Sequence, residues 1–456
     1  MKNFINDSIK NESLRTLKKL IAVPSVNKDE GDELAFPPFG KAIDQALKET
    51  LAVCDELGMD TFYDPEGFYG YAEYGDGEET VGVLCHLDVV PEGNREKWES
   101  DPFEGTERDG VLYGRGSQDD KGPTVAALYA FKAVVDAEET FNKKIRFIFG
   151  TDEEILWRCM NNYVKNEALP DLGFVPDGTF PLTYAEKGLL QLKLIGPGSD
   201  KLKLQCGSAP NVVPDRAEYA GAGMTELSQI FDNMDIPYIQ KDESIVVKGK
   251  SVHASVAGEG KNAISLLAKG LVAVQTHPVI SFISEKIGME TNGETLFGKV
   301  KDEVSGELTI NVGTLEINEN TSEVMLDIRI PVTYDKEEIV KVLKEKSSEY
   351  GLDYQEHDYL DSLYVPKDSE LVQSLLAIYR DKTGDLESEP LTSGGATYAR
   401  AMPNMVAFGA HFPSSKSLAH QENEGIKLDE FYQAMDIYAE TIYRLCCTED
   451  QQSNGE

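Results

Sequence analysis

Short apolar runs that alternate with helix-like segments constrain the fold of this chain more than any other feature. The runs TVGVLC (80–85) and IRFIF (145–149) are typical of buried strands. Between them lies a helix-like segment over 122–139, with Pro123 in its first turn, a position that suits proline. This alternation predicts an α/β sheet with helices packed on its faces.

The pattern of elements changes along the chain. Apolar residues recur at helical spacing over 14–21 and 43–54, which predicts two amphipathic helices at the start. After residue 187, strand-like and helix-like segments follow one another, including a helix over 262–277 and two strands joined by a turn at 318–320. We interpret this stretch as an inserted α+β domain. The predicted boundaries are 1–187 and 367–447 for the first domain, 188–366 for the insertion and 448–456 for a disordered tail.

The charge balance bears on the binding partners of the chain, and the cysteines bear on its cellular compartment. The 456 residues include 44 Lys and Arg against 80 Asp and Glu, a formal net charge of −36, so we expect no nucleic-acid partner. No run of about 18 uncharged apolar residues occurs, and the N-terminus lacks the apolar core of a signal peptide. The six cysteines are scattered and form no C-x-x-C pair, which fits a reducing compartment. We therefore expect a soluble cytoplasmic protein without a membrane partner.

Two motifs carry side chains that could bind a metal. His86 ends the first apolar run and Asp88 lies two residues on, so in extended backbone both side chains project to the same side. A carboxylate behind an imidazole suits a metal ligand, but a surface ion pair would look the same. Asp119 and Asp120 lie in the glycine-rich GRGSQDDKGP, where they could bind a metal or simply cap the following helix.

Three further motifs are ambiguous when each is taken alone. The run TDEE (151–154) follows the second apolar run, and such charge runs are usually solvated. Neighbouring Glu153 and Glu154 point in different directions, so one could bind a metal while the other faces a water. Asp177 in VPDG could be an ordinary turn residue, and a lone histidine such as His420 in AHQENEG is more often structural.

The joint pattern favours a metal site. Two imidazoles and three carboxylates follow the predicted strands of one sheet, from His86, Asp119, Glu154, Asp177 and His420. Mixed nitrogen and oxygen ligands suit zinc, manganese or cobalt, and the lack of thiolates argues against a structural zinc site.

Six motifs together resemble a known family. The series HLDVVPEG, GRGSQDDKGP, GTDEE, VPDG, SVHAS and AHQENEG, in this order and spacing, resembles the dinuclear metallopeptidases that include aminoacylase and carnosinase, and most closely their monomeric bacterial dipeptidase V-like branch. The resemblance implies a zinc-peptidase-like catalytic domain, with a mixed central sheet and helices on both faces, and an inserted α+β lid domain. It also implies a metal-dependent dipeptidase that acts on dipeptides with a free C-terminal carboxylate.

The resemblance assigns the metal ligands. It implies two divalent cations per chain, zinc first, with manganese or cobalt as alternatives. His86 and Asp177 would bind one cation, Glu154 and His420 would bind the other, and Asp119 would bridge both.

Further roles near the metals follow from the same resemblance. Glu153 would be the general base that acts on a metal-bridged water, and Asp88 would hold the ring of His86. The peptide bond between Asp119 and Asp120 would be cis.

The resemblance also assigns residues that bind the substrate. His253 in GKSVHAS would polarise the scissile carbonyl from the lid. The remaining substrate contacts would come from Asn211, Arg329, Gly394, Gly395 and Arg400. No ligand position is matched by the other three histidines, which we interpret as structural: His277, His357 and His411.

Two alternative functions stay open at this point. A deacylase or desuccinylase of N-acyl amino acids would share the fold, although aspartate rather than glutamate at Asp177 favours peptide cleavage in this family. A non-catalytic metal-binding protein would not need Glu153 beside its metals. The length of the insertion, longer than the lids of the family's dimers, predicts a monomer that acts on small peptides.

Overall fold

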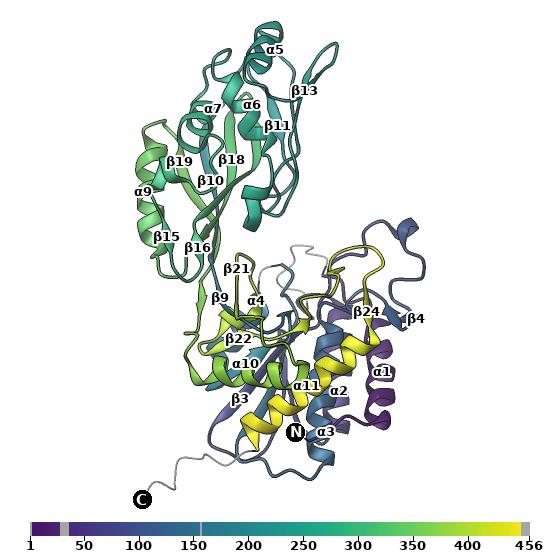
Figure 1. The fold of residues 1–456 in the computed structure, drawn as a ribbon. Coiled ribbons are helices and arrows are strands. Elements are labelled where there is room, and N and C mark those ends of the chain that lie inside the picture. The colour runs from purple at the N-terminus through teal and green to yellow at the C-terminus, as the bar shows by residue number, and fades with distance from the viewer. Residues whose placement is uncertain (1, 28–35, 156, 448–456) are drawn as a thin grey trace, which may run out of the picture. The chain divides into compact units, whose positions relative to one another are not determined.

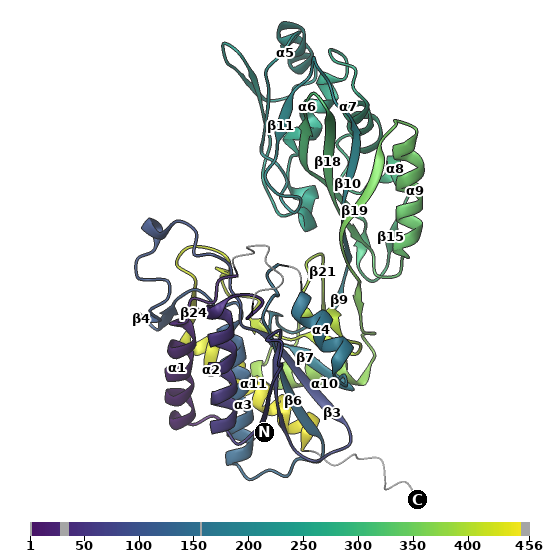
Figure 2. The ribbon, with the colours of Figure 1, turned by 180° about the vertical axis from the view of Figure 1, so that it is seen from behind.

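The chain forms two compact units (Figures 1 and 2). The computed structural model describes residues 2–27, 36–155 and 157–447. Unit 1 comprises Met1–Tyr184, Val365–Leu391 and Thr397–Glu456, and unit 2 comprises Ala185–Tyr364 and Thr392–Ala396. The short segment Thr392–Ala396 thus belongs to the same unit as the long insertion. The tail predicted to be disordered, 448–456, lies outside the described residues.

A mixed sheet is the centre of unit 1. Its strands, in spatial order, are β1 (Asp60–Tyr63), β2 (Gly70–Tyr74), β6 (Lys144–Gly150), β3 (Thr80–His86), β7 (Leu172–Val175), β22 (Met405–Ala407), β9 (Thr183–Glu186) and β20 (Leu363–Tyr364), with β21 (Leu391–Ser393) paired to β9. Strand β3 runs parallel to both β6 and β7, and β22 runs parallel to β7. The other pairs on this path are antiparallel. The two apolar runs that were predicted to be strands are β3 and β6.

Helices cover both faces of this sheet. Tyr74 of β2 packs edge-on against Phe131 of α3 (Lys121–Asp136), with ring centroids 5.2 Å apart. Tyr71 of the same strand packs edge-on against Tyr163 of α4 (Arg158–Asn166). Side chains three positions apart on a strand point to opposite faces, so α3 and α4 lie on opposite sides of the sheet. The predicted α/β fold with a mixed central sheet is confirmed.

The remaining long helices of unit 1 pack against α3, against the sheet or against one another. They are α1 (Asp7–Ile21), α2 (Lys41–Glu56), α10 (Glu370–Thr383) and α11 (Leu428–Cys446). Both α1 and α11 pack against α3, which explains why α3 is apolar on nearly every side. Helix α10 in turn packs against α11 (Figure 1). The first two helices confirm the amphipathic segments predicted at the start of the chain.

Short elements complete unit 1. They are the three-stranded sheet β24 (Gly425–Lys427), β5 (Val111–Tyr113) and β4 (Thr106–Arg108), the pair β23 (Ala410–His411) and β8 (Gly178–Thr179), and the 3₁₀ turns η1 (Arg95–Lys97) and η4 (Tyr398–Ala401). Strand β24 directly precedes α11, so the loop that carries His420 is anchored at its C-terminal end by both elements.

Unit 2 is an α+β unit with its own core. Its larger sheet has the order β11 (Leu204–Cys206), β17 (Thr309–Ile317), β18 (Thr321–Ile330), β10 (Gly188–Pro197) and β19 (Asp353–Leu360), and the pairs of β17 with β18 and of β10 with both neighbours are antiparallel. Two small sheets add β12 (Arg216–Tyr219), β14 (Ile245–Lys248) and β13 (Tyr238–Gln240), and β15 (Lys301–Asp302) with β16 (Gly306–Glu307). The hairpin predicted at 318–320 is confirmed by the pairing of β17 with β18.

The helices of unit 2 pack on the larger sheet or against one another. They are α5 (Met224–Asn233), α6 (Ala263–Leu271), α7 (Pro278–Phe282), α8 (Glu294–Phe297) and α9 (Lys336–Ser348), with the short segments η2 (Ala254–Glu259) and η3 (Ile283–Ile287). The helix predicted over 262–277 is wrong in its second half, because α6 ends at Leu271. Pro278 begins α7, and a proline disfavours helical backbone in the residue before it, His277.

Candidate metal centre

Parallel strands bring four of the predicted residues to one edge of the sheet. His86 is the last residue of β3, and the neighbouring β6 and β7 end at Gly150 and Val175. Glu153 and Glu154 follow β6 closely, and Asp177 follows β7. Because the three strands are parallel, these side chains emerge together at the carboxyl edge, where α/β sheets bind their ligands.

Asp119 lies between two imidazoles. Its Oδ1 is 2.9 Å from Nε2 of His86, and its Oδ2 is 3.0 Å from Nε2 of His420. Nε2 of His420 also lies 3.1 Å from Oε1 of Glu154, and Nε2 of His86 lies 3.8 Å from Oδ2 of Asp177. All five predicted ligands therefore gather in one cluster, in which the two oxygens of Asp119 face different histidines.

The two residues that follow Asp119, Asp120 and Lys121, hold its turn in place by hydrogen bonds. The carboxylate of Asp120 accepts hydrogen bonds from the backbone N–H of His86 and from the hydroxyl of Thr124, each at 3.1 Å. The ammonium of buried Lys121 donates to the carbonyls of Leu20 and Val23, at the end of α1. The peptide bond from Asp119 to Asp120 is cis, which confirms that prediction.

Asp88 makes contacts that the sequence did not predict. Nδ1 of His86 lies 2.9 Å from the backbone carbonyl of Asp88 and 3.6 Å from its carboxylate. The carboxylate instead accepts hydrogen bonds from the backbone N–H groups of Glu153 and Glu154, at 3.0 and 3.1 Å. The main chain of Asp88 therefore holds the imidazole most closely, while its side chain holds the turn after β6.

Two residues that were not predicted, Asp152 and Trp157, support this turn. Buried Asp152 accepts hydrogen bonds from the guanidinium of Arg158, at 2.8 and 3.0 Å, and from the amide of Asn27 at 2.7 Å. The indole of Trp157 donates to the carbonyl of Glu153 at 2.7 Å. In the sequence, the positive charge of Arg158, six residues after Asp152, could have indicated that one carboxylate of this acidic run is paired rather than solvated.

The electrostatics of the cluster favour a bound cation. Burial, with the nearby negative charge of Asp119, raises the pKa of Asp177 to about 7. Burial also raises the pKa of Glu154. For His420, hydrogen bonds to Asp119 and Glu154 raise the pKa to about 11. Carboxylates crowded in this way repel one another unless positive charge is placed among them.

The donor set fits a divalent metal. Ligand atoms of His86, Asp119 and Glu154 lie within 4.8 Å of one another, which is close enough to hold a metal ion among them. Imidazole and carboxylate donors of this kind suit zinc, manganese and cobalt alike. The described residues therefore contain a possible metal site, and the donor chemistry does not distinguish among these three metals.

The residues predicted to bind substrate lie mostly in unit 2. Nδ1 of His253 accepts a hydrogen bond from the backbone N–H of Ser255 at 3.2 Å and lies 2.7 Å from the Ser255 hydroxyl. An Nδ1 that accepts from a backbone N–H carries no proton, so the neutral ring has its proton on Nε2. The backbone carbonyl of Asn211 accepts from the N–H of Ala254 at 2.8 Å, which ties this loop to the start of η2.

Arg329 is held by a buried carboxylate. Its Nε and Nη2 donate to Asp327 at 2.6 and 2.9 Å, and its Nη1 donates to the carbonyl of Gly394 at 2.8 Å. The N–H of Gly395 donates to the hydroxyl of Ser393 at 2.9 Å. Unit 2 therefore brings Arg329 next to the glycine pair, whereas Arg400 is part of η4 in unit 1.

The three remaining histidines differ in their surroundings. His277 is buried in unit 2, and burial lowers its pKa. His357 is exposed on β19. His411 lies on β23, next to Thr179 of β8 and close to the segment that carries Asp177, and burial lowers its pKa as well.

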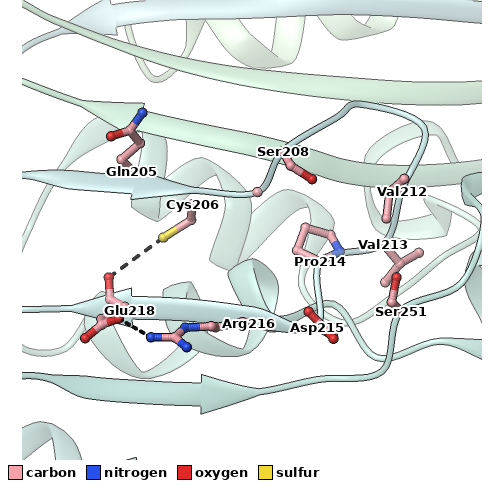
Figure 3. A pocket seen from close by; sticks show the side chains of 11 residues that line it. Gln205, Cys206, Ser208, Val212, Val213, Pro214, Asp215, Arg216, Glu218 and Ser251 are labelled. Carbon is pink, nitrogen blue, oxygen red and sulfur yellow. Dashed lines mark hydrogen bonds and ion pairs between the residues drawn. The ribbon is translucent and has the colours of Figure 1, made fainter. Parts of the chain in front are cut away.

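A polar pocket of about 390 Å³ lies within unit 2, between β11 and β12 (Figure 3). Arg216 forms an ion pair with Glu218 in its wall, and the thiol of Cys206 lies 3.8 Å from the backbone carbonyl of Glu218. The residues that line it include none of those predicted to bind metal or substrate.

A two-unit α/β chain with imidazole and carboxylate donors at the carboxyl edge of its sheet has the construction of a metal-dependent hydrolase. The model of peptidase family M20/M25/M40 matches residues 82–444. The chain belongs to this family, and it is a metallopeptidase. Among the described residues, no helix is long and apolar enough to cross a membrane.

Relatives of similar length are known. The chain is 35% identical over 461 residues to putative dipeptidase YtjP of Bacillus subtilis (strain 168), a match that covers 96% of this chain and 97% of the relative. It is 34% identical over 455 residues to putative dipeptidase SH1171 of Staphylococcus haemolyticus (strain JCSC1435), covering 94% of this chain and 96% of the relative.

Solved structures share the fold at low sequence identity. The M20 family metallo-carboxypeptidase Sso-CP2 from Sulfolobus solfataricus gives a TM-score of 0.59 at 19% identity, over 94% of this chain and 98% of that one. Human carnosine dipeptidase 1 gives a TM-score of 0.57 at 16% identity, over 95% and 96% of the two chains. These similarities concern the fold.

Proposed function

We propose that this chain is a metal-dependent dipeptidase that hydrolyses dipeptides with a free C-terminal carboxylate. The observation that carries the proposal is the position of Asp119, whose two oxygens face the imidazoles of His86 and His420 at 2.9 and 3.0 Å. A carboxylate placed in this way can bridge two cations. The names of the full-length relatives, putative dipeptidases, support the substrate class.

The contacts divide the ligands into two sets. His86 and Asp177 lie on the Oδ1 side of Asp119, and His420 and Glu154 lie on its Oδ2 side. We assign one divalent cation to each set, and Asp119 is a ligand of both cations. Zinc is the first choice of metal, and manganese and cobalt are the alternatives. When bound, such cations polarise a carbonyl and make water more acidic.

Glu153 is the general base in this proposal. It is adjacent to the ligand Glu154, and its backbone is held between the carboxylate of Asp88 and the indole of Trp157. A carboxylate fixed beside the reacting atoms can take a proton from water and deliver it to the leaving amine. Asp88 serves as a positioning residue, because its main chain orients His86 while its side chain orients the turn of Glu153.

Unit 2 supplies the substrate contacts. Because Nδ1 of His253 accepts a hydrogen bond from the N–H of Ser255, the neutral ring carries its proton on Nε2. The Nε2–H group can then donate a hydrogen bond to the carbonyl oxygen of the substrate. Arg329, held by Asp327, keeps a fixed guanidinium orientation for the C-terminal carboxylate, and Asn211 would add an amide. The backbone of Gly394 and Gly395 and the side chain of Arg400 complete the proposed substrate set.

One assay tests this function against its rivals. Purified protein, loaded separately with zinc, manganese and cobalt, is given a panel of dipeptides, tripeptides, dipeptide amides and N-acyl amino acids. We expect turnover of free dipeptides. Preferential turnover of N-acyl or N-succinyl amino acids would identify a deacylase instead, and no turnover with any metal would identify a binding protein.

We also propose that the enzyme is a cytoplasmic monomer. The six cysteines are free, and five of them are buried, which suits a reducing compartment. Unit 2, with Ala185–Tyr364 as its main part, is long enough to supply the substrate contacts from one chain. Analytical ultracentrifugation of the metal-loaded protein tests the oligomeric state.

A further inference from the structure

A buried ion pair lies next to the candidate metal centre, and no step of the proposed reaction uses it. Arg115 and Glu424 are 1% and 0% exposed, and Nη1 of Arg115 donates to Oε2 of Glu424 at 2.5 Å. Nη2 of Arg115 also donates to the carbonyl of Pro91 at 3.1 Å, and its guanidinium lies over the ring of Trp98. Contacts with Pro91 and Trp98 of unit 1 therefore hold the guanidinium of Arg115 in place.

The second oxygen of Glu424 reaches the backbone of the proposed bridging ligand. Oε1 accepts hydrogen bonds from the N–H of Gln118 at 2.8 Å and from the N–H of Asp119 at 3.3 Å. Glu424 itself stands four residues after His420. One buried carboxylate thus connects the segment that carries Asp119 with the segment that carries His420.

The side chain of Gln118 also connects the segment of Asp119 with the segment of His420. Its Oε1 accepts from the N–H of Leu418 at 2.7 Å, and its Nε2 donates to the carbonyl of Gly425 at 2.8 Å. These contacts lie on both sides of His420 in sequence. The loop around His420 is therefore attached to the Asp119 turn before and after the imidazole.

His420 depends on such attachments. It belongs to no helix or strand, its φ is +63°, and its side chain is 53% exposed. A residue with this backbone conformation keeps its place only if its surroundings hold it. The contacts from Gln118 and Glu424 are well suited to do so.

We propose that Arg115, Gln118 and Glu424 form a clamp, and that these positioning residues set the distance between Asp119 and His420. The clamp thereby determines how tightly the chain holds the cation assigned to Asp119, Glu154 and His420. This inference rests on the proposed function. Residues that orient metal ligands from behind typically change metal affinity by roughly 10- to 100-fold when they are removed.

Gln118→Met is the main test, because it removes the side-chain hydrogen bonds of Gln118 to Leu418, Gly425 and Lys416 without leaving a buried charge unpaired. Elemental analysis after dialysis against a weak chelator, and competition titration with a coloured chelator, report metal content and affinity. We expect the variant to retain one cation per chain where the wild type retains two, with affinity for the lost cation reduced roughly 10- to 100-fold. Excess metal should restore kcat, with KM unchanged.

Two further variants make the test specific. Glu424→Gln should show the same metal loss, and its far-UV circular dichroism shows whether it folds. Glu73→Gln breaks another Arg–Glu pair of unit 1, with Arg146 at 2.6 Å on β2 and β6, whose side chains are 10% and 22% exposed, and should keep both cations. The matched pair separates an effect on the metal loops from a general loss of stability.

Several outcomes would overturn the clamp. Wild-type affinity for both cations in Gln118→Met would do so even if its melting temperature fell, because the contacts would then only stabilise the fold. Equal metal loss in Glu73→Gln would do so as well. A wild-type protein that binds no metal and cleaves no dipeptide would instead refute the proposed function.

Discussion

Nε2 of His420 lies 3.0 Å from Oδ2 of Asp119, although the long insertion Ala185–Tyr364 separates the two residues in the sequence. The first loop precedes α3, and the second precedes β24 and α11. Because α11 packs against α3 and β24 pairs with β5, the fold of unit 1 brings the two loops together. The candidate metal centre therefore depends on the return of the chain to unit 1 after unit 2.

Removal of metal should abolish activity. The proposed ligands bind cations only in their deprotonated forms, and bound cations would make a water more acidic. We expect dialysis against a strong chelator to remove dipeptide hydrolysis and added zinc, manganese or cobalt to restore it. Elemental analysis run in parallel checks the result, and full activity in metal-free protein would contradict the dinuclear assignment.

Substitution of the neighbouring Glu153 and Glu154 should have different effects on activity and metal content. Glu153→Gln should retain both cations and lose roughly 10²- to 10⁴-fold in kcat, the usual effect of removing a general base. Glu154→Gln should instead lose metal, because Glu154 is the residue that contacts His420. If elemental analysis finds the metal loss in Glu153→Gln and not in Glu154→Gln, the two roles are reversed.

The two proposed substrate contacts in unit 2, His253 and Arg329, should affect different kinetic constants. His253→Ala should lower kcat roughly 10²- to 10³-fold with little change in KM, because it removes a contact made mainly in the transition state. Arg329→Ala should raise KM for free dipeptides and leave dipeptide amides, which lack the carboxylate, nearly unaffected.

Metal content is the control for both variants, since neither residue is a proposed ligand. Asp327→Asn provides a matched variant for Arg329, because it disturbs the partner that orients the guanidinium. Equal losses with amides and free dipeptides in Arg329→Ala would show that the arginine only supports the fold.

Gly150 should not tolerate a side chain. A Cβ on this residue would lie 2.8 Å from Cζ of buried Tyr398 and nearer still to two other atoms of that side chain. Overpacking of this kind costs about 1–3 kcal/mol, so Gly150→Ala should unfold at lower denaturant concentration. Gly258→Ala is the control, because its new Cβ would meet its nearest neighbour, Oγ1 of Thr291, at 3.5 Å. Equal midpoints for the two variants would contradict the packing argument.

His277 should make stability depend on pH. Burial lowers its pKa in the folded chain, so below about pH 6.5 the unfolded chain binds a proton that the folded chain resists. This contribution is present above the unfolded pKa and declines as the pH falls. We expect His277→Gln to reduce the fall in melting temperature of metal-free protein between about pH 7 and pH 5. Parallel curves for variant and wild type would show that His277 does not contribute.

Local patterns were sufficient to predict much of the fold and the composition of the site. The apolar runs predicted β3 and β6, the turn at 318–320 predicted the hairpin, and the positions after the strands indicated His86, Glu154 and Asp177. Such features depend on residues close together in sequence, since strand alternation, helical spacing and turn chemistry all act over a few positions.

Tertiary structure decided the relationships between distant residues. Which oxygen of Asp119 faces which histidine, the use of the Asp88 carboxylate by the backbone of Glu153 and Glu154, and the link from Glu424 to Asp119 all depend on packing between separate elements. The early end of α6 shows the same limit, because the periodic apolar pattern continues where the helix does not. A single sequence records which side chains are available, whereas their mutual distances are set only when the sheet and its helices pack.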